Sequence, residues 1–265
     1  KYSAFEWRAR HFDAVDYDAT HPGRRYGVGF AQVQKNYGSG AEAAVVTLEL
    51  DRDGRLTMRH AAHEMGPGVT TSQAVIVARI LGRAPDRMSY GVVEWPEMPL
   101  TSTELPFTTP QATEDELQRN PRWTPTFVSP MATSNSAYYF GHATREAALV
   151  LLRYGIWPAV ANGKIIAGDL QPLPLSALAA KAHELGAVTG ACVHAFNRRE
   201  WAEAEFDLPG AGRVGLPVDA LAVKYGDGAA PALKALMRVG GFHFIERATV
   251  RYPPVQRVNA GVTRY

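Results

Sequence analysis

The feature that most constrains the fold of this sequence is a pair of β-rich segments joined by a short turn. Ala43 to Leu50 and Leu56 to His63 are both rich in apolar and β-branched residues, and Asp51-Arg52-Asp53-Gly54 lies between them. Such segments are typical of strands, and an acidic residue followed by glycine is a strong turn signal. The sequence therefore predicts a β-hairpin over these residues.

Two hydroxyl-rich loops lead directly into predicted helices. Gly66 to Ser72 precedes a helix expected over Gln73 to Leu81, and Met131 to Ser136 precedes a longer helix expected over Ala137 to Tyr154. Hydroxyl side chains are favoured N-caps, and the free N–H groups at a helix start suit a phosphate or a polar ring system. Ordinary helix capping explains either loop taken alone.

The other segments predict helices and strands in no repeating order. We expect Gly155 to end the long helix in the left-handed conformation, and Ser176 to Leu185 to form a further helix that stops at Gly186. The apolar stripe of the long helix is expected at Tyr139, Ala143, Ala147, Val150 and Leu151. Further strands are expected at Tyr26 to Val33, Met88 to Trp95, Ala187 to Phe196 and Phe242 to Tyr252. Mixed sheets interleaved with packed helices indicate an α+β fold.

The composition changes near Trp157 to Pro172, where glycine, proline and short apolar runs gather. We therefore divide the chain into a first α+β subdomain over 1–160 and a second α+β subdomain over 161–265. The first residues, Lys1 to Arg25, have no clean periodicity, and we expect them to wrap over a neighbouring surface. The chain opens without methionine and stops within a β-branched and aromatic run, so we expect a fragment that is incomplete at its C-terminus.

Charge and cysteine content exclude several classes of function. The 28 basic and 26 acidic residues leave a net charge of +2, which gives no broad field to hold nucleic acid or an anionic membrane. Cys192 is the only cysteine, so an internal disulfide and a cysteine-ligated iron–sulfur cluster within this chain are excluded. The sequence has no apolar run of membrane-spanning length and no signal-peptide layout at its first residues, so we expect a cytoplasmic protein, with the periplasm as the alternative.

The segment His60-Ala61-Ala62-His63-Glu64 brings two imidazoles and a carboxylate close together in sequence. The order differs from the zinc-protease motifs, and residues three apart in a strand point to opposite faces. We therefore predict no metal site here. A metal-dependent hydrolase built on His60, His63 and Glu64 is kept as the most distant alternative.

Taken in order, several segments resemble the second molybdopterin-binding region of the molybdenum hydroxylase family, which includes xanthine dehydrogenases and aldehyde oxidoreductases. The matching segments are Arg25 to Gly29, the acidic-glycine hairpin, Glu64 to Gln73, Leu81-Gly82 and Ser129 to Ala137. Tyr252 to Pro254 and Asn259 to Val262 are similar to a bacterial branch of the family. By this resemblance, 1–160 is a molybdopterin-binding subdomain.

The resemblance implies which residues contact the molybdenum cofactor. In that family two loops hold the pterin and its phosphate, or an attached nucleotide, through backbone N–H groups and hydroxyls. The corresponding positions here are Gly66, Pro67, Gly68, Thr71, Thr133, Ser134, Asn135 and Ser136. The family usually has glutamine where this chain has Pro67, and proline offers neither an N–H nor a side-chain amide.

The resemblance also implies an activity and a set of partners. The family hydroxylates aldehydes or aromatic N-heterocycles with oxygen derived from water, using molybdopterin, in some members with a cytosine dinucleotide. Iron–sulfur clusters and FAD are expected on other subunits or domains, together with the rest of the large subunit. The family's catalytic glutamate motif has no counterpart in this chain, so its catalytic residues are unknown and we expect the isolated chain to be inactive. The alternative is a non-catalytic interaction or scaffold module that has lost the cofactor.

Overall fold

The computed structural model divides into two units, Lys1–Asn36 and Tyr37–Tyr265. The residues that it describes are 7–27, 31, 44–101, 111–117, 119–125, 135–162, 175–196 and 202–251. In the first unit, helix α1 spans Trp7–Thr20, and the backbone N–H of Tyr26 donates to Asp18 at 2.9 Å. The sequence did not predict this helix because its apolar residues do not gather on one side. Most of the strand predicted over 26–33 lies outside the described residues.

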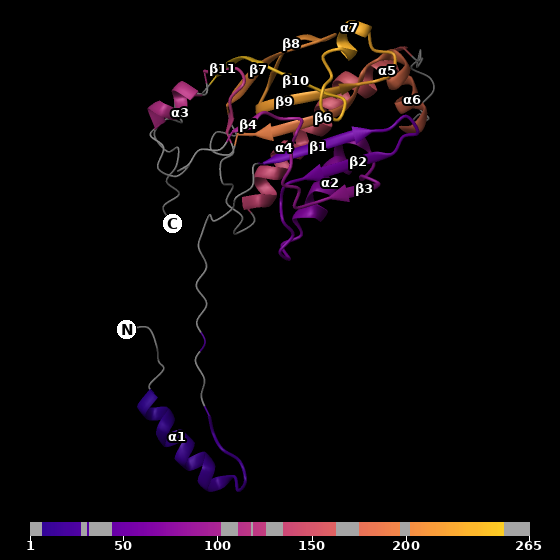
Figure 1. Ribbon diagram of the computed structural model, residues 1–265. Coiled ribbons are helices and arrows are strands. Elements are labelled where there is room, and N and C mark those ends of the chain that lie inside the picture. The colour runs from indigo at the N-terminus through magenta and orange to yellow at the C-terminus, as the bar shows by residue number, and fades with distance from the viewer. Residues whose placement is uncertain are drawn as a thin grey trace. The chain divides into compact units, whose positions relative to one another are not determined.

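A six-stranded sheet, called the main sheet below, organises the second unit (Figure 1). Its strand order is β10-β9-β6-β1-β2-β3, and only the β2–β3 pair is parallel. The strands are β1 (Val45–Leu50), β2 (Leu56–His60), β3 (Arg87–Ser89), β6 (Val188–Ala195), β9 (Val218–Tyr225) and β10 (Phe242–Ile245). This mixed sheet with packed helices confirms the predicted α+β class.

Two smaller sheets and seven helical segments complete the described part of the second unit. One small sheet has the order β11-β7-β8, with β7 (Glu203–Leu208), β8 (Gly212–Leu216) and β11 (Arg247–Arg251), and the other pairs β4 (Leu100–Thr101) with β5 (Thr124–Pro125). The helices are α2 (Val69–Leu81), α3 (Gln111–Leu117), α4 (Asn135–Leu151), the π-helix η1 (Leu152–Ile156), α5 (Trp157–Asn162), α6 (Leu175–Leu185) and α7 (Pro231–Lys234).

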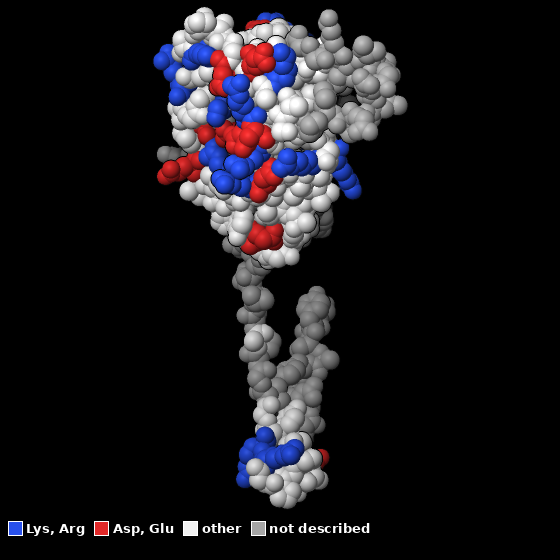
Figure 2. All heavy atoms as spheres, turned by 90° about the vertical axis from the view of Figure 1, so that its right-hand side faces the viewer, with Lys and Arg blue, Asp and Glu red and all other residues white. Residues whose placement is uncertain are grey.

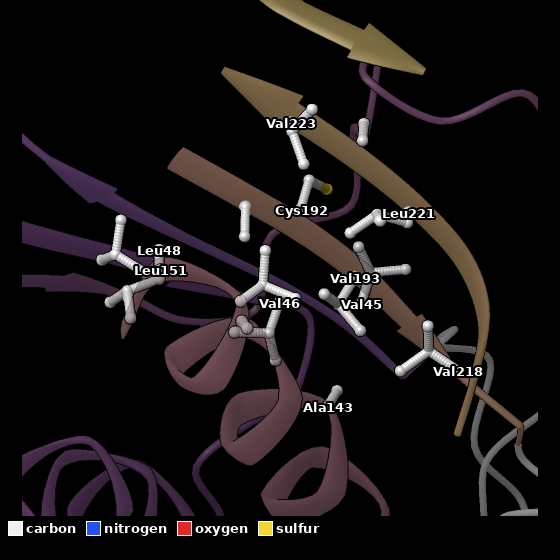
Figure 3. Packing of buried hydrophobic residues seen from close by; sticks show 14 of the residues in the cluster. Val45, Val46, Leu48, Ala143, Leu151, Cys192, Val193, Val218, Leu221 and Val223 are labelled. Atoms are coloured by element: carbon white, nitrogen blue, oxygen red, sulfur yellow. The ribbon is translucent and has the colours of Figure 1, made fainter. Parts of the chain in front are cut away.

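The core lies where α4 packs against the central strands β1 and β6. All eight residues of β6 are buried, and Glu49 is the only residue of β1 that is not. Figure 3 shows Val46 and Leu48 beside α4, with Leu48 close to Leu151. The predicted stripe of α4 is confirmed, because Ala143, Ala147, Val150 and Leu151 are fully buried and Tyr139 packs against the core. On the opposite face, Arg59 lies 5.2 Å over the buried Trp95 ring.

The main sheet has two chemically different ends, which we name by their contents. At the turn end lie the β1–β2 turn and the last residues of α2, since Arg83 donates to the Gly54 carbonyl at 3.2 Å. At the helix-start end lie the end of β2 and the start of β1, because His60 pairs with Val46. The helix α2 returns from the end of β2 to the start of β3, so it begins at the helix-start end.

The helix α4 begins at the same end as α2. His142, in the middle of α4, lies 2.9 Å from the carbonyl of Pro217, which directly precedes β9. Beyond its last residue, Gly155 lies against the carbonyl of Val188, at the start of β6. Because β6 ends where β9 begins, α4 runs from the helix-start end to the turn end, as α2 does.

The structure confirms several local predictions with shifted boundaries. The hairpin forms as β1 and β2, and α6 ends at Gly186, whose φ is 66°. The helix α2 begins at Val69 rather than Gln73, and its N-cap is Gly68 with no side-chain hydrogen bond. The prediction that a hydroxyl residue caps this helix is therefore wrong. The strand predicted over Met88 to Trp95 is also shorter, since only Arg87–Ser89 pairs.

The expectation that Gly155 ends the long helix is wrong for a steric reason. The chain continues as a π-helix and then as α5 to Asn162, and Gly155 is not among the glycines with positive φ. A Cβ at this position would lie 2.0 Å from the carbonyl oxygen of Val188. Glycine is therefore required here for close backbone approach, and not for a left-handed turn.

The segment predicted as one strand over Phe242 to Tyr252 forms two strands in different sheets. β10 joins the main sheet, and β11 joins β7 after the break at Glu246. The boundary predicted between 160 and 161 stays a prediction; β1 and β6, from its two sides, pair in one sheet. In the described part of the chain, no helix has the length and apolar character that crossing a membrane requires.

Candidate functional site

The segment from Glu64 to Thr71 contains the end of the loop between β2 and α2 and the first residues of α2, at the helix-start end. Gly66 and Gly68 have φ angles of 102° and 75°, a region that side chains other than glycine rarely adopt. A Cβ on either glycine would meet nothing within 4 Å, so backbone conformation and not space requires them. The sequence motif therefore encodes one specific loop shape.

The carboxylate of Glu64 occupies the centre of this loop. Its Oε1 accepts from the backbone N–H groups of Gly66 at 2.8 Å and Gly68 at 3.1 Å, and its Oε2 accepts from that of Thr70 at 3.1 Å. These donors hold the pKa of Glu64 below its usual value, with the Thr70 N–H contributing most and the Gly66 N–H next. A negative charge at a helix start is also favoured by the helix dipole.

This geometry corrects one expectation from the sequence. The N–H groups of the loop were expected to be free for a ligand, but those of Gly66, Gly68 and Thr70 already donate to Glu64. The N–H groups of Gly66, Gly68 and Thr70 form this arrangement, and Pro67, which has no N–H, contributes no donor to it. Pro67 is therefore compatible with the loop as it is folded.

The three hydroxyls at the start of α2 differ in exposure. Ser72 donates to the carbonyl of Gly68 at 2.8 Å, and the Oγ1 of Thr70 is buried and has no hydrogen-bond partner among the residues that the structure describes. Thr71 is exposed. Of the residues predicted to bind a cofactor in this loop, Thr71 is thus the one that presents a side-chain hydroxyl to solvent.

The second predicted loop falls mostly outside the described residues. Thr133 and Ser134 are not described, and Asn135 and Ser136 are described only as the first backbone residues of α4. What the structure establishes is the position of the helix that this loop enters. The starts of α2 and α4 face the same end of the main sheet, and the two helices pack against each other.

A buried polar contact joins the first half of α2 to the middle of α4. The hydroxyl of Thr144 donates to Oε1 of Gln73 at 2.6 Å, and both residues are buried. The Nε2 of Gln73 has no partner among the described residues. A buried polar group without a partner costs free energy in the folded state, so this contact is a specific feature and not general packing.

His60 is buried beneath the same loop. Its ring lies 6.3 Å from that of Phe140 in α4 and 6.5 Å from that of Tyr90, measured between centroids. Neither ring nitrogen reaches hydrogen-bond geometry with a described residue. Burial lowers the pKa of His60 to about 4, against smaller opposing effects of the Ala62 backbone and the Glu64 charge. The imidazole is therefore neutral at neutral pH.

A buried charged cluster at the same end was not predicted from the sequence. Arg247 donates to Asp219 at 2.6 Å and to the carbonyls of Asn120 and Trp123 at 2.8 and 2.6 Å. The Nδ1 of His194 lies 3.3 Å from the other oxygen of Asp219, and the side chains of both residues are fully buried. The partners are far apart in sequence, so no local motif signals this cluster.

The histidine-rich segment does not form a three-ligand cluster in the described residues. His60 is buried, whereas His63 and Glu64 are exposed, and the Glu64 carboxylate binds backbone N–H groups instead. Within the same residues, no group of three or more histidine, cysteine, aspartate or glutamate side chains has metal-binding geometry. The hydrolase alternative therefore has no geometric support here.

Comparison with known families points to one class of ligand. Residues 2–94 match the family model of the molybdopterin cofactor-binding domain, a range that ends after the Glu64 loop and α2. No curated protein matches the chain. The family match supports a protein that binds molybdopterin, and such a domain implies a molybdenum enzyme.

The described residues fit such a group in one respect and disagree in another. Two helix starts at one end of the sheet, one of them preceded by an exposed glycine loop, fit a large polar ligand. The backbone donors of that loop do not fit an anion while Glu64 holds three of them. The exposed residues of this segment are Glu64, Met65, Gly66, Pro67 and Thr71.

Proposed function

We propose that this chain is a fragment of the molybdenum-cofactor-binding subunit of an oxidoreductase of the xanthine dehydrogenase or aldehyde oxidase type. The enzyme hydroxylates aldehydes or aromatic N-heterocycles with oxygen derived from water. The observation that carries the proposal is the common direction of α2 and α4, whose starts face one end of the main sheet. The match of residues 2–94 to a molybdopterin cofactor-binding domain supports the same assignment.

In this proposal the helix-start end forms one wall of the cofactor site. Gly66, Pro67, Gly68 and Thr71 contact the cofactor from the α2 side. Thr133, Ser134, Asn135 and Ser136 contact it from the α4 side. The bound cofactor supplies the redox chemistry, and the part played by this chain is to bind and orient it. The dipole of α4 favours an anionic or electron-rich group on its side of this wall, whereas the start of α2 already holds the Glu64 carboxylate.

The catalytic base and the electron acceptors belong to other parts of the enzyme. The remaining large-subunit regions, iron–sulfur clusters and, in some arrangements, FAD complete the electron path. A cytosine dinucleotide form of the cofactor is one of the alternatives that this wall accepts. The isolated chain therefore binds no substrate productively, and no hydroxylase activity is expected from it.

Metal and pterin analysis of the complete native assembly tests this function. We expect molybdenum and a fluorescent pterin oxidation product, both in proportion to the chain. An assembly that contains neither identifies the chain as a non-catalytic scaffold module with the same fold. Zinc in place of molybdenum redirects attention to a hydrolase, which the geometry of His60, His63 and Glu64 does not favour.

A further inference from the structure

We propose that Glu64 acts as an internal anion at the start of α2, so that this loop does not fit the phosphate end of the cofactor. The inference rests on the proposed function for the identity of the ligand. The occupation of the loop by Glu64 stands on geometry alone. Glu64 is thereby a residue that determines specificity at this wall.

The Glu64 carboxylate already occupies the position at the start of α2 that a bound anion would take. The first helical hydrogen bond of α2 runs from the N–H of Ser72 to the carbonyl of Gly68 at 2.9 Å. The N–H groups before it have no helical partner, and those of Gly68 and Thr70 donate to the two oxygens of Glu64. Gly66 adds a third donor at 2.8 Å from outside the helix. A phosphate at this helix start would need the same donors.

Binding of a phosphate next to the Glu64 carboxylate is electrostatically unfavourable. A phosphate placed at the mouth of the loop would approach the Glu64 carboxylate, and two like charges a few ångströms apart repel each other. The loop itself contains no lysine or arginine between Glu64 and Gln73 that would offset this repulsion. The loop is therefore poorly suited to the phosphate end of a cofactor as long as Glu64 remains seated.

Amide NMR of the full chain tests the seating of Glu64 without any cofactor. Titration from neutral to acidic pH should move the amide resonances of Gly66, Gly68 and Thr70 together, with one midpoint below that of an ordinary glutamate. Glu64→Ala should abolish this common transition, and Glu64→Gln should shift the three signals without a pH response. Glu184→Gln, an exposed glutamate at the turn end, is the matched control and should leave them unchanged. Independent or absent titration of the three amides in the wild-type chain would overturn the proposal.

Inorganic phosphate tests the selectivity in the same samples. We expect phosphate at about ten millimolar to perturb the amides of Gly66, Gly68 and Thr70 in Glu64→Ala and to leave them unmoved in the wild-type chain. Equal perturbation in both proteins, or none in either, would contradict an anion seat filled by Glu64. Absence of molybdenum from the native assembly would end the proposed function and leave these two results standing, so the two failures are distinguishable.

Discussion

The two ends of the main sheet treat polar groups in opposite ways. At the turn end, the charged pairs lie at the surface. Arg52 lies 3.2 Å from Asp227. Asp86 accepts hydrogen bonds from the backbone N–H of Leu56 and from Arg83. Figure 2 views the side toward which β1 points in Figure 1, and basic and acidic atoms alternate across it. At the helix-start end, His60, Gln73, His194 and Asp219 are buried, and each keeps at least one polar atom that has no partner among the described residues, as does the buried Thr189 at the turn end.

The difference indicates which end of the sheet is optimised for stability and which end is not. Exposed pairs of opposite charge contribute little to stability and keep a surface soluble. Buried polar groups without partners are costly, and native structures keep them mainly where a ligand, a water or a function uses them. Such groups are more numerous at the helix-start end, which favours this end as the one to test for function. Substitutions at the two ends should therefore differ in size and in sign.

The largest effect is expected from Arg247→Met at the helix-start end. The substitution leaves the buried Asp219 carboxylate without its cation, and breaking a buried ion pair costs about 3–5 kcal/mol of unfolding free energy. Urea unfolding followed by circular dichroism measures it. Arg213→Met removes an exposed partner of Asp207 and should change stability far less. Equal losses in the two variants would remove the distinction between buried and exposed pairs.

Gly155→Ala should destabilise the turn end by about 1–3 kcal/mol, because the new methyl group would overlap the Val188 carbonyl. The contrasting variant is Gly82→Ala, where φ is 73° and a Cβ would meet nothing within 4 Å. Its cost of roughly 1–2 kcal/mol comes from left-handed backbone strain alone. Chemical denaturation measures both losses. A displaced Val188 carbonyl in a structure of Gly155→Ala, with no such displacement in Gly82→Ala, supports close approach as the cause. Unchanged stability of Gly155→Ala would refute it.

His60→Phe should remove a pH dependence from the helix-start end. The folded pKa of His60 is about 4 and its unfolded value is 6.5, so the folded state excludes a proton that the unfolded state binds. Stability is complete above pH 6.5 and falls as the pH drops toward 4, by on the order of 3 kcal/mol for the full shift. The phenylalanine variant should lose this part of the acid sensitivity. Parallel stability–pH curves for the two proteins would count against a buried neutral imidazole.

The smallest effect is expected from Arg52→Gln at the turn end. The side chains of Arg52 and Asp227 are 63% and 67% exposed, and such a pair typically contributes less than about 1 kcal/mol. The unfolding midpoint should stay close to that of the wild-type chain, and the small difference should shrink further in added salt. A loss comparable with that of Arg247→Met would contradict the comparison between the two ends.

Local features of the fold were predictable from the sequence, whereas the distant contacts were not. The hairpin β1–β2 and the helix α6 depend on nearby turn and stop residues, and both formed as predicted. Gly155 was misinterpreted because its role depends on the Val188 carbonyl, which comes from a later strand. Helix α1 was missed because its apolar residues do not lie on one side of the helix, so its sequence has no amphipathic pattern.

The candidate site shows the same division. The glycine loop between β2 and α2 was located from its motif. The left-handed conformation of its glycines explains why glycine stands at these positions of the motif. The seating of Glu64 was not anticipated, because a carboxylate that reaches forward to three N–H groups has no fixed sequence signature. The Arg247–Asp219 pair joins separate strands, so its partners could not be matched without the topology. The residues Thr133 and Ser134 lie outside the described part, and their role stays a prediction.

The most direct test of the account places one carboxylate at each end of the sheet. Ser134→Asp adds a negative charge where the cofactor phosphate is expected, and Ser176→Asp adds the same charge at the exposed start of α6, at the turn end. The measurement is the molybdenum content of the purified complete assembly, relative to the chain. The account predicts at least about a tenfold loss for Ser134→Asp, which corresponds to 1.4 kcal/mol of lost affinity, and wild-type content for Ser176→Asp. Wild-type molybdenum content in both variants, or an equal loss in both, would contradict a cofactor wall at the helix-start end.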